Sequence, residues 1–286
     1  MLMNAKMNRR SFGVSLAALG ISVLHGFSNS TRLALLSDLH ISLDPENENR
    51  GFKPARNLQK IVADIAAREL DSTVLTGDLA RLEGLVGDYE ALKALLQPVA
   101  SKMPINVSLG NHDNRKNFLS VFGAQKRTQA VKDKQIAVME TPVVRLIFLD
   151  SLLMTNLTPG ALGKAQRVWL DEYLKTSDNL PVILFFHHTT DDRDDSLFDF
   201  PRLWERIRTE RKVKAILFGH SHRWGVTQQE EIHLINLPAT GYNFSDDQPV
   251  GWVEATLTAE GGTFLLHAIG GDTSQDNKSI SLAWRK

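Results

Sequence analysis

The chain has 286 residues, and its 33 lysines and arginines balance 33 aspartates and glutamates, so the formal net charge is zero. This balance gives no support for nucleic-acid binding or for stable membrane binding, because proteins that bind these anionic partners usually carry an excess of basic residues. The chain contains no cysteine, which excludes disulfides, thiolate metal ligands and cysteine nucleophiles. Any metal ion must therefore bind histidine, carboxylate or amide groups, which suit manganese, iron and zinc.

The first 30 residues predict a twin-arginine export signal. Arg9 and Arg10 precede Ser11, Phe12 and a short apolar stretch over residues 14–24. This stretch is shorter than the roughly 20 apolar residues that a membrane-spanning helix needs, and it resembles a secretion signal. We expect residues 1–30 to direct the protein to the periplasm and residues 31–286 to form a single domain. A leader that does not function would leave the protein in the cytoplasm.

From residue 31 onward, apolar runs of strand length alternate with amphipathic segments. Period and length predict strands at 32–37, 72–76, 105–109, 135–140, 142–149, 181–186 and 213–218, and helices at 55–70, 89–99 and 163–175. The last third predicts four successive strands, at 224–228, 232–237, 251–257 and 263–269, and a polar surface turn at 271–279. This order predicts an α/β fold of two packed sheets flanked by helices.

Five of the predicted strands end in residues that bind metal ions. The strand ends carry Asp38-Leu39-His40, Gly77-Asp78, Gly110-Asn111-His112-Asp113, His187-His188 and Gly219-His220-Ser221-His222. In open α/β sheets, sites form outside the carboxyl ends of the strands. In extended chain, alternate residues point the same way, so both members of Asp-x-His and His-x-His can face one ion. Each motif alone is weak, but six of the nine histidines lie in these five strand ends.

This ordered set resembles the calcineurin-like metallophosphoesterase superfamily over residues 38–222. Within it, the chain is most similar to the bacterial class III phosphodiesterases, which act on cyclic nucleotides or glycerophosphodiesters. That family usually has proline after the double histidine, whereas Thr189 follows it here. The resemblance implies a four-layer α-β-β-α sandwich of two packed mixed sheets flanked by helices.

The resemblance also implies a role for each motif residue. One ion would bind Asp38, His40, Asp78 and His222, and a second would bind Asp78, Asn111, His187 and His220, with Asp78 bridging them. His112 would lie beside the substrate as a proton donor, oriented by Asp113. Four residues are candidates for the substrate pocket: His188, Trp224, Tyr242 and Asn243. For Trp224 and for the loop of Tyr242 and Asn243, ordinary packing is the alternative interpretation.

The sequence therefore predicts a metal-dependent phosphoesterase with two metal ions (manganese, iron or zinc). We expect a metal-bridging hydroxide to attack a phosphodiester in line, while His112 protonates the leaving oxygen. The ions' charge exceeds that of Asp38, Asp78 and the hydroxide together, so the site would attract a small phosphorylated substrate. The alternatives are a phosphomonoesterase or pyrophosphate hydrolase on the same site, or a non-catalytic binding protein with this fold. No sequence pattern indicates the oligomeric state.

Overall fold

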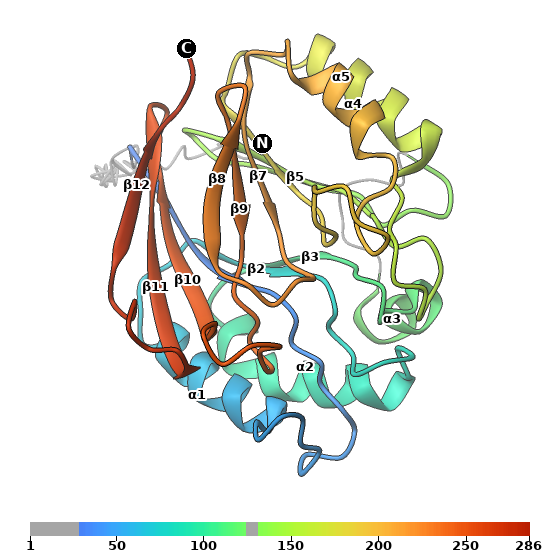
Figure 1. The fold of residues 1–286 in the computed structure, drawn as a ribbon, viewed down its shortest axis with the longest axis vertical. Coiled ribbons are helices and arrows are strands. Elements are labelled where there is room, and N and C mark those ends of the chain that lie inside the picture. Colours follow the sequence, from blue (N-terminus) through green and yellow to red (C-terminus); the bar gives the residue numbers. More distant parts are fainter. Residues whose placement is uncertain (1–28, 124–130) are drawn as a thin grey trace, which may run out of the picture.

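The computed structural model describes residues 29–123 and 131–286, so nearly all of the predicted export signal lies outside the described residues. Two mixed sheets of six strands each pack face to face, with helices on both outer faces (Figure 1). The four-layer α/β sandwich is therefore confirmed. Within the described residues, no helix has the length and apolar character to cross a membrane.

The first sheet has the strand order β12-β11-β10-β1-β2-β3. Its strands are β1 (Thr31–Leu36), β2 (Ser72–Thr76), β3 (Ile105–Ser108), β10 (Pro249–Leu257), β11 (Gly261–Gly271) and β12 (Ser279–Ala283). Strands β1, β2 and β3 run parallel, and β10 to β12 extend the sheet as antiparallel neighbours. Three helices belong to this half: α1 (Pro54–Ala66), α2 (Val86–Ala100) and α3 (Arg115–Phe122).

The second sheet has the order β4-β5-β6-β7-β9-β8. Its strands are β4 (Ala137–Glu140), β5 (Arg145–Phe148), β6 (Val182–Phe185), β7 (Val213–Phe218), β8 (Gly225–Gln229) and β9 (Ile232–Asn236). Strands β5, β6, β7 and β9 are parallel, whereas β4 and β8 are antiparallel edge strands. Helices α4 (Gly163–Thr176) and α5 (Phe200–Ile207) pack on its outer face.

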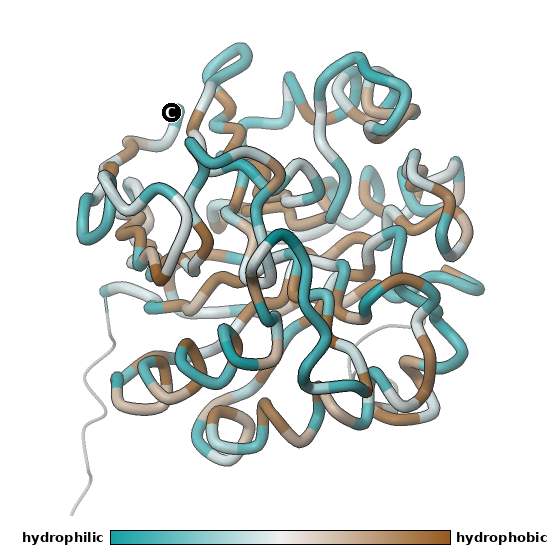
Figure 2. Tube along the Cα trace, turned by 60° about the horizontal axis from the view of Figure 1, so that its bottom comes forward, coloured by the Kyte–Doolittle hydropathy of each residue, from teal (hydrophilic) through white to brown (hydrophobic). Residues whose placement is uncertain are grey.

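Strand β1 shows why these strands read as continuous apolar runs. Leu33 and Leu35 pack between the two sheets, while Ala34 and Leu36 pack against the helices of the first half. A strand covered on both faces needs apolar residues at every position, and burial of each leucine side chain stabilises the fold by roughly 1.5–3 kcal/mol. In Figure 2 hydrophobic segments run through the interior and hydrophilic loops surround them.

Most predicted elements are found, with shifted ends. Strands β2 and β7 match their predicted ranges, and β4 pairs with β5 as the predicted hairpin. Helix α1 ends at Ala66 rather than at residue 70, and α2 begins at Val86, three residues before the prediction. Helix α3 and strand β12 were missed. Strand β12 is short, it pairs only with β11 among the described strands, and none of its residues is buried, so it lacks a buried apolar pattern.

Candidate metal centre

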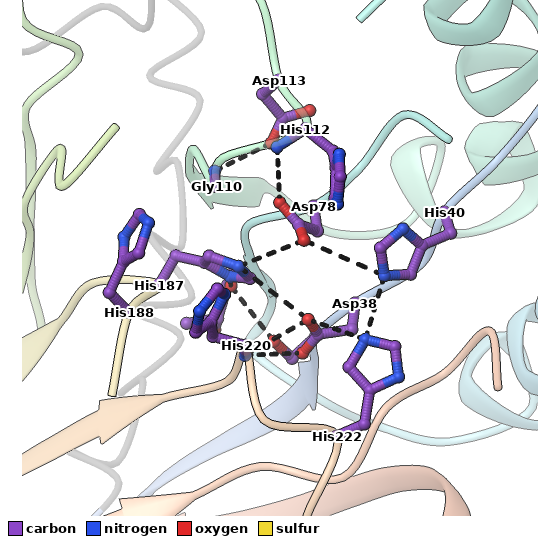
Figure 3. A network of polar contacts seen from close by, with 12 residues as sticks. Asp38, His40, Asp78, Gly110, His112, Asp113, His187, His188, His220 and His222 are labelled. Carbon is purple, nitrogen blue, oxygen red and sulfur yellow. Dashed lines mark hydrogen bonds and ion pairs between the residues drawn. The ribbon is translucent and has the colours of Figure 1, made fainter. Parts of the chain in front are cut away.

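The carboxyl ends of β1, β2, β3, β6 and β7 converge at one end of the two sheets, so their terminal residues form a single cluster (Figure 3). Backbone hydrogen bonds join the loops. Asp38 N donates to Gly77 O at 3.1 Å, and His40 N donates to Asp78 O at 2.9 Å. The loop after β7 is tied to the loop after β6 by Gly219 N, which donates to His187 O at 2.9 Å. The five motifs therefore lie together, as the parallel strands predicted.

Three groups of described side chains in this cluster have the spacing of metal ligands, and two of these groups share no residue. Asp38, His40 and His222 form one group, and Asp78, His187 and His220 form another; within each, ligand atoms lie within 4.8 Å of one another. His222 Nε2 is 3.4 Å from Asp38 Oδ1, and His187 Nε2 is 3.3 Å from Asp78 Oδ2. His40 Nε2, 3.9 Å from Asp78 Oδ2, connects the two groups. The first group lies within one of the ligand sets that the resemblance implies, and the second lies within the other.

Backbone carbonyls set which nitrogen of the candidate ligand histidines faces the centre. Nδ1 lies near a carbonyl oxygen in three of them: His40 with Arg81 at 3.3 Å, His187 with Thr76 at 2.8 Å and His222 with Tyr242 at 2.5 Å. A carbonyl oxygen only accepts, so Nδ1 carries the proton and Nε2 presents its lone pair in the neutral ring. Such partners orient metal-ligating histidines in known metal sites.

This arrangement fits a bound cation and is unfavourable without one. His40 Nε2 and His222 Nε2 are 3.0 Å apart. Burial lowers the pKa of His40 to about 4, so its Nε2 carries no proton at neutral pH and offers a lone pair to an ion. Asn111 Oδ1 and His187 Nε2 are buried without a hydrogen-bond partner. Unpaired buried polar atoms are costly, and metal ions would satisfy these two atoms.

The charges in the cluster also suit metal ions. Burial alone would raise the pKa of both carboxyls, but His222 and His187 beside Asp38, and His187 beside Asp78, hold both pKa values well below the ordinary range. Burial would lower the pKa of His187, yet Asp78 and Asp38 raise it to about 9. Two buried carboxylates are therefore ionised, and they retain a proton on His187 that a bound ion would displace.

The backbone of the ligand loops is strained. Five candidate ligands have positive φ angles: Asp38, His40, Asp78, His220 and His222. Such conformations cost about 1–3 kcal/mol each and persist where the surrounding structure enforces them. At Gly110 a Cβ would lie 2.5 Å from the Asp78 backbone nitrogen, and at Gly219 it would overlap Ser37 and Asp38. These two glycines let backbone and ligand carboxylates approach closely.

His112 is half buried at the edge of the cluster. Its backbone N donates to Asp78 Oδ1 at 2.9 Å, and its ring Nδ1 lies 3.0 Å from Leu82 O. The ring also groups with His40 and Asp78 at metal-ligand spacing. The Leu82 carbonyl keeps the proton on Nδ1, so Nε2 is the atom that gains or loses one.

The expectation that Asp113 orients the His112 ring is wrong, because Leu82 O does so. Asp113 is fully buried and accepts hydrogen bonds from Gly110 N at 2.9 Å, from Tyr89 OH at 3.0 Å, and from two backbone N–H groups of the loop after β2. Burial and the charge of Asp78 raise the pKa of Asp113 to about 6, although the backbone donors oppose the rise. Asp113 therefore fixes the loops after β2 and β3 to each other.

His188 is fully buried behind the cluster. Its Nδ1 lies 2.8 Å from Ser151 Oγ, which also accepts from His187 N at 3.2 Å. Its ring centroid is 4.9 Å from that of His220. Ser151 was missed by the sequence reasoning; its position just after β5, at the same end of the sheet, was the available signal.

The other three pocket candidates lie at different distances from the cluster. The Tyr242 ring is buried, with its centroid 4.9 Å from His40 and 4.8 Å from His222. Asn243 is buried and donates through Nδ2 to Gln248 O at 2.7 Å, which holds its own loop together. Trp224 packs against the core between the sheets and lines a neighbouring cavity. Of the three, Tyr242 contacts the candidate ligands.

A cavity of about 230 Å³ opens beside His220 and His222. Phe244, Arg193, Asp195 and Arg223 contribute to its walls. None of these four was named as a candidate site residue, although Phe244 directly follows the candidates Tyr242 and Asn243 in the same loop. Their sequence context shows only that they follow metal motifs in the chain, because side-chain exposure at a cavity depends on how loops from different strands meet.

Comparison with known proteins agrees with this geometry. The family model described as calcineurin-like phosphoesterase matches residues 31–224. A probable cyclic nucleotide phosphodiesterase of Vesicomyosocius okutanii is 29% identical over 80% of this chain and 94% of its own length. The 3',5'-cyclic adenosine monophosphate phosphodiesterase CpdA of Vibrio vulnificus is 25% identical, covering 82% of this chain and 88% of its own.

Among solved structures, a dimetal phosphatase from Danio rerio has the same fold. Its TM-score is 0.71 at 16% identity, and the match covers 89% of this chain and 99% of that one. The family match spans the strands and loops that carry all five motifs. The chain belongs to the calcineurin-like phosphoesterase family, and it is a metal-dependent phosphoesterase.

Proposed function

We propose that this protein hydrolyses a small phosphodiester with two metal ions held in the cluster. One ion would bind Asp38, His40, Asp78 and His222, and the other Asp78, Asn111, His187 and His220. The observation that carries this proposal is the pair of Nε2 atoms of His40 and His222, 3.0 Å apart beside two buried carboxylates. Manganese, iron and zinc all accept this donor set.

Two such ions, when bound, supply Lewis-acid stabilisation of the phosphoryl oxygens and a water nucleophile at neutral pH. The residues of the chain hold the ions and the substrate in place. Asp78 belongs to both ligand sets, and its other oxygen, Oδ1, accepts from His112 N. This backbone contact and the contact of the ring with Leu82 O hold His112 at the edge of the cluster, where its ring would lie beside a bound phosphate.

His112 is proposed to protonate the leaving oxygen. The bond to Leu82 O keeps Nδ1 as a donor, so the imidazolium form presents Nε2–H to the site. After that proton is transferred to the leaving oxygen, the neutral ring keeps its orientation. General acid catalysis of this kind contributes about 10²–10⁴-fold in rate.

A diester is the proposed substrate because the curated relatives are named phosphodiesterases that act, by their names, on cyclic nucleotides. The experiment is a comparison of bis(p-nitrophenyl) phosphate with p-nitrophenyl phosphate, using the full chain and added manganese. We expect faster hydrolysis of the diester and loss of activity in Asp78→Asn. Asp178→Asn is the matched control, because Asp178 is exposed and pairs with Arg145 at the amino end of β5.

Faster hydrolysis of the monoester would move the assignment to a phosphomonoesterase. Full diesterase activity in Asp78→Asn would contradict the shared role of this carboxylate. No hydrolysis of either ester by a protein that holds both ions would count against the proposed activity as a whole.

A further inference from the structure

The cavity beside the metal cluster contains an exposed aromatic ring. Phe244 is 53% exposed, although large apolar side chains usually gain by burial. Its ring centroid is 4.0 Å from that of His222, at an interplanar angle of 18°, so one face is stacked on a candidate metal ligand. Tyr242 meets it edge-on, with centroids 5.8 Å apart at 76°. The ring is thus held in a fixed orientation while part of it lines the cavity.

A polar wall of the same cavity is also fixed in place. Arg193 donates to Asp195 Oδ2 at 2.7 Å, which leaves Asp195 Oδ1 buried and without a hydrogen-bond partner. Ser196 Oγ donates to Asp191 Oδ1 at 2.5 Å and lies 2.8 Å from Thr189 Oγ1. Thr189 therefore supplies a hydroxyl, where the family usually has proline, that ties this acidic loop to the double-histidine motif.

These two walls define the chemistry of the group that would enter. An exposed aromatic face favours a planar aromatic group, and stacking of a base on an aromatic side chain is sequence-tolerant and substantial. Asp195 also lines this cavity, and its carboxylate favours a group with an N–H or O–H donor. Because His220 and His222 line the cavity too, whatever occupies it lies next to a phosphate held by the ligands.

We propose that Phe244 is a specificity-determining residue: it stacks on a planar, nitrogen-bearing aromatic ring of the substrate, whose N–H edge donates to Asp195. The inference rests on the proposed phosphodiesterase function, and it extends that function to the part of the substrate beyond the phosphate. A diester without a planar group has nothing to stack on Phe244, so it gains no binding there.

The test compares two diesters that share the reaction and differ in shape. Bis(p-nitrophenyl) phosphate carries planar rings, whereas glycerophosphoglycerol carries none. Phe244→Ala is expected to raise KM for the planar diester about tenfold, in line with base–aromatic stacking, with glycerophosphoglycerol kinetics altered less than twofold. Phe244→Tyr should retain the wild-type KM. Phe198→Ala is the matched control, since Phe198 is 58% exposed and does not line this cavity.

A second experiment tests whether Asp195 accepts a hydrogen bond from the substrate. Asp195→Asn should raise KM for 3',5'-cyclic AMP, whose base carries an amino group, several-fold more than KM for bis(p-nitrophenyl) phosphate, which has no donor. Metal content is measured in every variant, because Phe244 also covers His222. Equal changes for planar and non-planar diesters, or loss of metal in Phe244→Ala, would show that Phe244 acts through His222 and would overturn the proposal.

The specificity role of Phe244 and the proposed phosphodiesterase activity can be refuted separately. Wild-type hydrolysis of bis(p-nitrophenyl) phosphate with no effect of Phe244→Ala overturns the specificity role and leaves the phosphodiesterase intact. No wild-type hydrolysis of any diester removes the proposed function itself.

Discussion

At the scale of single residues, backbone carbonyls determine which ring nitrogen of each histidine in the site faces the cluster. His40, His187 and His222 each present Nε2 to the cluster because Nδ1 lies near a carbonyl, and Leu82 does the same for His112. Residue type alone does not predict these contacts, because any residue can supply a carbonyl. The sequence therefore predicted which histidines converge, and the structure adds which nitrogen each one uses.

His112→Ala tests the proton donor through the leaving group. A nitrophenolate leaves readily without protonation, whereas an alkoxide needs a proton in the transition state. We expect the variant to lose about 10²–10⁴-fold in kcat on 3',5'-cyclic AMP and far less on bis(p-nitrophenyl) phosphate. Equal losses on both substrates, measured at full metal content, would argue against a donor role and for a role in binding.

Asp113 shows where reasoning from motifs failed. The family resemblance implied a contact between the side chains of Asp113 and His112, but the turn after β3 points the two in different directions. The carboxylate instead accepts from Gly110, Tyr89 and the loop after β2. Adjacent residues in a turn do not share a face, so only the folded backbone reveals such a partner.

At the scale of elements, Glu254 links three parts of the first half of the fold. From β10 it accepts from Arg32 of β1 at 2.7 Å and from Arg68, just after α1, at 2.9 Å. Burial would raise the pKa of Glu254, but the hydrogen bond and charge of Arg32 and the charge of Arg68 hold it below its ordinary value. A carboxylate with a lowered pKa in the folded state stabilises it at neutral pH.

Glu254→Gln should therefore lower the free energy of unfolding by about 1–3 kcal/mol at pH 7. Protonation removes the same interaction from the wild-type protein, so the difference should shrink as the pH falls through roughly 4.3, the ordinary value for glutamate, and below. Urea unfolding of both proteins at pH 7 and pH 4 measures it. A difference that is constant with pH would contradict an ionic contribution.

The elements that were predicted well are those covered on both faces. Strands β2 and β7 are almost wholly buried and read as bounded apolar runs. Strand β12 is partly exposed, and its end depends on a distant contact. Arg285, just beyond this strand, donates to the carbonyl of Val213 in β7 at 2.9 Å. It also donates to the carbonyl of Arg208, just after α5, at 2.8 Å. Such a long-range cap leaves no local sequence pattern.

At the scale of the whole molecule, the site forms where the two sheets meet. The first half contributes Asp38, His40, Asp78 and Asn111, and the second contributes His187, His220 and His222. The loop after β9 also joins the halves, because Gly241 N donates to Asp38 O at 2.9 Å. Neither sheet alone can form the cluster, so the site requires both the motifs at the strand ends and the packing of the two sheets against each other.

We further propose that Arg9 and Arg10 direct export of the protein to the periplasm. Replacement of both by lysine preserves the charge and should abolish recognition by a twin-arginine pathway, so the protein should accumulate in the cytoplasm. Fractionation of cells that express the two forms measures this. A cytoplasmic wild-type protein, or an unchanged periplasmic fraction in the variant, would contradict the proposed signal.

The most direct test of the two-ion centre is the metal content of the full chain, measured by mass spectrometry after loading with manganese. We expect two ions per chain in the wild-type protein and in His112→Ala, about one in His222→Ala, and fewer than two in Asp78→Asn because Asp78 is shared. One ion or none in the wild-type protein, or two retained in Asp78→Asn, would contradict a two-ion centre bridged by this carboxylate.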